Sequence, residues 1–96
     1  MRPSLALSQH REALIEIARR HGVENVRVFG SVIHGTDIEG SDIDLLVDAP
    51  RGTTLFDLAG IEIEASDLTG VRFDVCTPEC LSVRYRNTVV SEAVPL

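Results

Sequence analysis

The chain has 96 residues, 15 of them acidic and 9 basic, which gives a formal net charge of −6. This balance argues against a general nucleic-acid-binding protein, because such proteins normally present a basic face. With 44% apolar residues, no apolar run of membrane-spanning length and no signal-peptide pattern, residues 1–96 are expected to form one small domain.

The first part of the chain predicts a long helix and a short strand. Apolar residues recur at helical spacing and predict an amphipathic helix over residues 5–20, capped by Ser4 or Ser8 and ended by Gly22. Residues 26–29 then form a short strand. The helix residues predicted to face the core are Leu7, Leu14, Ile17 and Ala18.

A polar loop over residues 35–40 separates the first strand from the second. Asp37 and Glu39 lie in this loop and are expected at the surface. The second strand covers residues 42–47 and ends at the turn-forming residues 49–52. Side chains alternate between the two faces of a strand, so its core face is expected to consist of Ile43, Leu45 and Val47.

The chain then predicts another helix and another strand. Thr53 or Thr54 can cap a helix over residues 55–66, a turn follows at 67–70, and residues 71–76 alternate as a strand. The face of this helix that the spacing favours consists of Leu55, Leu58, Ala59 and Ile63.

The last part of the chain is predicted less sharply. Thr77-Pro78-Glu79 is a suitable helix start, residues 81–90 are weakly helical, and residues 93–96 receive no element. The alternation of helices and strands predicts an α/β (α+β) domain in which helices flank a small mixed β-sheet.

Two carboxylates stand out in the second strand. Asp42 and Asp44 lie two residues apart, so both are expected to point to the face opposite the core. Carboxylates held side by side repel each other unless a cation lies between them. Oxygen ligands of this kind suit Mg²⁺. Asp48, at the end of the same strand, is expected to be solvated.

Two further features can converge on this pair if the strands share one sheet. Gly30-Ser31 forms a strand-to-helix turn, where glycine lets the backbone approach a ligand and N–H groups attract phosphate oxygens. Asp74 is the one acid on the third strand. Three carboxylates beside a phosphate-binding turn predict a site for one or two Mg²⁺ ions and a nucleoside triphosphate.

These residues resemble a known signature. Gly30-Ser31, ten intervening residues and then Asp42-Ile43-Asp44 are similar to the motif of the polymerase-β-type nucleotidyltransferase superfamily. Within that superfamily the chain resembles the minimal nucleotidyltransferases. The segments that carry this second likeness are residues 28–31, 41–48, Asp74 with residues 77–79, and the closing residues 92–96.

The resemblance implies the nucleotidyltransferase fold and an antitoxin partnered with a helical HEPN ribonuclease toxin. AMP would pass from ATP to a tyrosine hydroxyl of the toxin. The resemblance also implies the role of each site residue. Asp42, Asp44 and Asp74 would be the catalytic metal ligands, with Asp74 also helping to deprotonate the acceptor, and Gly30 and Ser31 would hold the phosphates.

One position departs from the family pattern. Members often read Gly-Ser-x-Ala-Arg-Gly, whereas this chain has His34 where the arginine stands. Histidine titrates near neutral pH and offers fewer donors than arginine. Nucleotide binding, which the resemblance assigns to His34 and Ser41 together with Gly30 and Ser31, could therefore be weaker or pH-dependent.

Two other functions stay open at this point. The chain could neutralise its toxin by direct binding with little or no catalysis, or it could modify a small molecule with a separate substrate-binding subunit. A partner surface is expected on the last helix and residues 93–96. Cys76 and Cys80 match neither a zinc nor a redox spacing and are expected to be reduced thiols of a cytoplasmic protein.

Overall fold

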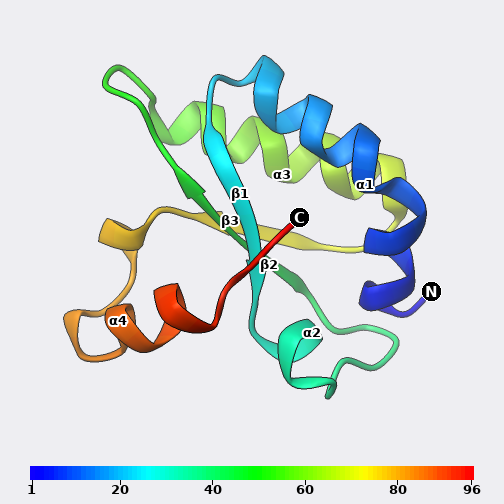
Figure 1. Ribbon diagram of the computed structural model, residues 1–96. Coiled ribbons are helices and arrows are strands. Elements are labelled where there is room, and N and C mark those ends of the chain that lie inside the picture. Colours follow the sequence, from blue (N-terminus) through cyan, green and yellow to red (C-terminus); the bar gives the residue numbers. More distant parts are fainter.

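The structure, a computed structural model, describes all residues from 1 to 96. Four strands form one mixed sheet in the order β3-β2-β1-β4 (Figure 1). β1 (Glu24–Phe29) pairs antiparallel with β2 (Ile43–Asp48) and with β4 (Val94–Pro95), whereas β2 and β3 (Phe73–Cys76) run parallel. With helices flanking this sheet, the predicted fold class is confirmed.

The helices gather in two groups around the sheet. α1 (Pro3–Arg20) and α3 (Leu55–Thr69) lie side by side on one face (Figure 1). The short α2 (Ser31–His34), the 3₁₀ helix η1 (Pro78–Cys80) and α4 (Val83–Glu92) lie away from that pair. None of these helices is long and apolar enough to cross a membrane.

The core lies between the sheet and the α1–α3 pair. The predicted core residues of α1 are all buried, and so are Ile43, Leu45 and Val47 on β2. Leu46 is also fully buried, on the opposite face of β2, where Asp44 lies. Burying one such aliphatic side chain stabilises the fold by about 1.5–3 kcal/mol. The central strand is therefore held from both sides.

The position of α3 agrees with the prediction, but its core face does not. Thr54 caps the helix, and its hydroxyl and Asp57 form a reciprocal capping box. The helix continues through the predicted turn to Thr69 and ends at Gly70, which has a positive φ of 75°. The buried residues are Leu58, Ile61 and Ala65, whereas Leu55 and Ile63 are exposed. Of the four predicted core residues only Leu58 is buried, because α3 is apolar on more than one side.

The beginning of α1 also differs from the prediction. The helix starts at Pro3 without a side-chain cap from Ser4 or Ser8. Instead, the carboxylate of Asp37 accepts the backbone N–H of Ser4 at 2.9 Å, and Asp37 is only 3% exposed. A carboxylate at a helix N-terminus is favoured by the free N–H groups and the helix dipole. The surface prediction was wrong for Asp37 but right for Glu39, which is exposed.

Asp37 should make stability depend on pH. Its hydrogen bonds from Ser4 hold the pKa of the carboxyl below its ordinary value. A lowered pKa in the folded state means that the stabilisation is complete above the unfolded pKa and is lost as pH falls through the folded one. We expect Asp37→Asn to melt several degrees below the wild type at pH 7 and to match it more closely at strongly acidic pH. Thermal unfolding followed by circular dichroism at several pH values measures this; a pH-independent difference would contradict it.

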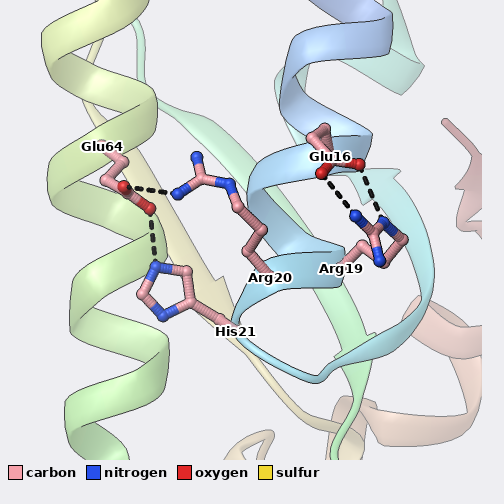
Figure 2. Close-up of polar contacts among 5 residues, drawn as sticks. All are labelled: Glu16, Arg19, Arg20, His21 and Glu64. Carbon is pink, nitrogen blue, oxygen red and sulfur yellow. Dashed lines mark hydrogen bonds and ion pairs between the residues drawn. The ribbon is translucent and has the colours of Figure 1, made fainter.

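A second contact fixes α1 against α3 (Figure 2). Glu64 accepts hydrogen bonds from Arg20 at 3.2 Å and from His21 at 2.6 Å. The His21 hydrogen bond is the main reason why the pKa of Glu64 is lowered. Gly60 leaves room for the ring, since a Cβ there would lie 2.5 Å from His21 Cε1. The Glu16–Arg19 pair also drawn in Figure 2 lies within α1 at the surface, where such pairs contribute little.

The C-terminal residues form an element that the sequence did not predict. Val94 and Pro95 pair with β1, and the N–H of Leu96 donates to the carbonyl oxygen of Val26 at 3.0 Å. Leu96 packs against the core. These residues therefore extend the sheet, although residues 93–96 were expected to form part of a free partner surface.

α4 is anchored chiefly through one side chain. Arg86 donates to the carbonyl oxygens of Pro78 at 2.7 Å and Leu81 at 3.1 Å, which ties the helix to η1. No residue of α4 is buried. The weak helix prediction for this part of the chain is confirmed, and the helix leaves Val83 79% exposed.

Candidate functional site

The candidate site lies at the middle of the sheet, where three elements meet. Asp44 on β2 is paired in register with Phe29 at the end of β1 on one side and with Asp74 on β3 on the other. Gly30 follows Phe29 directly and caps α2. Antiparallel pairing with β1 and parallel pairing with β3 thus bring the Gly30-Ser31 turn and both carboxylates together.

Gly30 is required by its backbone and by its neighbour. Its φ of 79° with ψ of −145° lies in a region that side-chain-bearing residues avoid. A Cβ at this position would collide with Oδ2 of Asp44 and lie 3.2 Å from its carboxyl carbon. The carboxylate of Asp44 therefore packs directly against the Gly30 turn.

The electrostatics around Asp44 indicate three mutually interacting acids. Burial raises the pKa of Asp44, and the negative charges of Asp74 and Asp42 raise it further. Asp42 lies just before β2, with its Oδ2 3.9 Å from Nε of Arg72. Phe73 and Val75, the neighbours of Asp74 along β3, are buried. No three His, Cys, Asp or Glu side chains close around one point at metal-ligand distance, so the three acids are neighbours and not a closed ligand set.

The remaining predicted site residues surround this centre. Ser31 is the first residue of α2. His34, the last residue of α2, places its Nε2 3.0 Å from Oε2 of Glu92 at the end of α4. The hydroxyl of Ser41 accepts the N–H of Ile38 at 3.0 Å and so closes the loop before Asp42. Its location fits a loop-shaping role at least as well as a direct phosphate contact.

Two contacts near the site were missed from the sequence. Glu92 is 58 residues from His34, and no local pattern signals such a pair. Asp48, which was expected to be solvated, accepts from Arg27 at 2.7 Å and from Asn25 at 3.0 Å. Alternation on neighbouring antiparallel strands could have suggested the Asp48–Arg27 pair, since both point to the face that carries Asp44.

The two cysteines behave as expected. Both are free thiols, and burial, reinforced by nearby negative charge, raises the pKa of Cys76 to about 11. A thiol with such a pKa is almost wholly protonated at neutral pH and is a poor nucleophile. The chemistry of this face therefore rests on its carboxylates.

Comparison with known proteins agrees with this geometry. The model of the nucleotidyltransferase domain family matches residues 7–96. The protein adenylyltransferase MntA of Thermococcus cleftensis is 34% identical and covers 82% of this chain and 80% of its own length. MJ0435 of Methanocaldococcus jannaschii, named as a candidate protein adenylyltransferase, is 31% identical over 92% of this chain and 95% of its own length.

Solved structures show the same fold. A candidate minimal nucleotidyltransferase superposes with a TM-score of 0.85 at 43% identity and covers 97% of this chain and 95% of its own. A toxin–antitoxin structure with AMP-PNP superposes with a TM-score of 0.74 at 20% identity over 88% of this chain and 69% of the other, a likeness of fold alone. From its site, its fold and its relatives, this chain belongs to the nucleotidyltransferase domain family of enzymes.

Proposed function

We propose that residues 1–96 form a single minimal nucleotidyltransferase domain that moves AMP from ATP to a tyrosine hydroxyl of a HEPN-type ribonuclease toxin in the cytoplasm, and so act as its antitoxin. The observation that carries the proposal is the packing of Asp44 between the Gly30 turn and Asp74. The names of the relatives support AMP transfer to a protein. The toxin–antitoxin neighbour with AMP-PNP supports the partner class and the nucleotide, while HEPN and tyrosine rest on the family resemblance.

The residues present fit a divalent metal. Asp42, Asp44 and Asp74 offer only carboxylate oxygens, which Mg²⁺ prefers. The mutual repulsion that raises the pKa of Asp44 would be relieved by a cation among them. Bound Mg²⁺ would neutralise charge on the triphosphate and on the attacking and leaving oxygens. We therefore assign these three residues as the ligands of one or two Mg²⁺ ions.

The chain's own groups would then orient the reactants. Gly30 and Ser31 would hold the β- and γ-phosphates, so that the α-phosphorus faces the acceptor. Asp74 would take the proton from the tyrosine hydroxyl while the tyrosine oxygen forms a bond to the α-phosphorus. The bond from that phosphorus to the bridging oxygen breaks, and pyrophosphate leaves with the electron pair. The toxin keeps AMP on its tyrosine.

A second function, neutralisation by binding alone, is favoured by one specific contact. The residue that replaces the family's arginine, His34, is exposed and paired with Glu92. An imidazole held in this way supplies fewer donors to a triphosphate than a free guanidinium. Such a chain could keep its partner surface while transferring AMP slowly.

Intact-mass spectrometry of the partner separates the two functions. A HEPN-type protein, the proposed toxin, would be incubated with the protein, ATP and Mg²⁺, and in parallel with the Asp42→Asn, Asp44→Asn double variant. Transfer predicts AMP-sized mass increments on the toxin that disappear with the double variant and when Mg²⁺ is chelated. A tight complex with unchanged toxin mass would instead support neutralisation by binding.

A further inference from the structure

α3 carries a second apolar face in addition to its core face. Leu55, Phe56, Ala59 and Ile63 fall within about 100° on the helix, at the 3.6-residue period of an α-helix. We call these four residues the α3 stripe. Phe56 is 87% exposed, Leu55 77% and Ile63 62%. Neighbouring large apolar side chains that stay exposed on one helix face typically mark an interaction site.

The stripe is continuous with the candidate site through a groove. This groove, of about 320 Å³, runs between α3 and the edge strand β3 and is lined by Ile63 and Asp67 on one side and by Arg72 and Asp74 on the other. One of the three carboxylate-bearing residues thus borders the same hollow as the end of the stripe. β3 is an edge strand of the sheet, so no further strand of the chain pairs with it on this side.

The negative charge of α3 indicates which kind of protein can bind the α3 stripe and the groove. α3 contains four acidic residues and no Lys or Arg. Glu62 and Asp67 flank the stripe on its two sides, and Glu62 also accepts the N–H of Val75 at 2.8 Å. Pairing α3 of one copy with α3 of a second would bring like charges together, which disfavours a homodimer. The surface instead complements a protein that presents apolar side chains with basic residues around them.

We propose that the α3 stripe and the α3–β3 groove are the docking surface for the acceptor protein, which supplies an apolar side chain beside Ile63 and basic side chains toward Glu62 and Asp67. The inference rests on the proposed function, since it names the surface on which the modified partner is held. Docking there brings the partner across the β3 edge toward Asp74. This placement replaces the expectation from the sequence that the last helix forms the partner surface, because no residue of α4 lines the groove.

Ile63→Arg tests this surface, with Val83→Arg on α4 as the matched control. Both replace an exposed aliphatic residue, so neither variant should change the melting temperature or the ATP affinity of the isolated chain. Losing the burial of one isoleucine on binding predicts that Ile63→Arg raises the Kd for the toxin by about tenfold or more. The KM for the toxin in AMP transfer should rise in parallel, with kcat unchanged at saturating toxin. Val83→Arg should stay within about twofold of the wild type.

The experiment tests the docking surface and AMP transfer separately, because the Kd for the toxin can be measured even if no AMP is transferred. If the wild type bound the toxin but transferred no AMP, the proposed function would be refuted. The Kd values of Ile63→Arg and Val83→Arg would still show whether the toxin docks on the α3 surface. Equal affinity of Ile63→Arg and the wild type, or a larger loss in Val83→Arg, would refute the α3 surface whatever the transfer assay shows.

Discussion

Asp44→Asn is expected to lower AMP transfer to the toxin by at least about a hundredfold, since it removes a charged group on which transition-state stabilisation depends. The melting temperature should not fall. Burial disfavours the negative charge of Asp44, and Asp74 and Asp42 repel it. A neutral amide of the same shape removes both unfavourable contributions to the free energy of folding. Initial rates of transfer and thermal unfolding, measured on the same preparation, test both halves of this result.

Asp48→Asn is the matched control on the same strand and face. Its carboxylate binds Arg27, whose side chain is only 11% exposed, so the change should cost about 1 kcal/mol of unfolding free energy by weakening the partner of a largely buried guanidinium. Transfer should stay close to the wild-type rate. If Asp48→Asn abolished transfer, or if Asp44→Asn left it intact, the assignment of the carboxylates would be wrong.

Gly30→Ala is expected to impair both the fold and the site. The backbone conformation at Gly30 would cost an alanine about 1–3 kcal/mol. The new Cβ would in addition collide with the Asp44 carboxylate, which would have to move away from the turn. We therefore expect a lower free energy of unfolding in urea, together with a loss of ATP binding measured by calorimetry on the protein that remains folded.

Gly52→Ala is the control that separates the effect of backbone strain from the effect of the collision with Asp44. Gly52 also has a positive φ, of 98°, but a Cβ there would meet no atom within 4 Å. This variant should lose stability and keep its ATP affinity. A Gly30→Ala protein that bound ATP as well as Gly52→Ala would contradict the idea that Asp44 must pack against the Gly30 turn.

The arrangement of the site could be anticipated because its parts are local. Alternation within β2 places Asp44 opposite the buried Ile43 and Leu45, and a strand ending in Gly30-Ser31 predicts a tight turn. The prediction that Asp74 lies beside these two segments depended on the three strands sharing one sheet. What alternation could not supply was the pairing of strands, which makes Asp44 the register partner of Asp74.

The errors arose where a distant segment decides the environment of a residue. Asp37 lies in a polar loop, and it is buried because the N-terminus of α1 packs against it. β4 has only two residues, one of them a proline, and is too short to show a strand periodicity. Its pairing with β1 could therefore not be predicted from the sequence. On α3, both faces are apolar, and only the packing against α1 and β3 shows which one is buried. The face left outside is the one now proposed to bind the partner.

In the proposed reaction this chain transfers the α-phosphoryl group of ATP, as AMP, to a protein. The most direct test is to incubate the chain, the proposed toxin partner and Mg²⁺ with ATP labelled at either the α- or the γ-phosphate and to separate the two proteins. We expect label on the toxin from the α-position alone, and none when Asp44→Asn replaces the wild type. Label from the γ-position, or an unlabelled toxin within a complex that has formed, would contradict the proposed reaction.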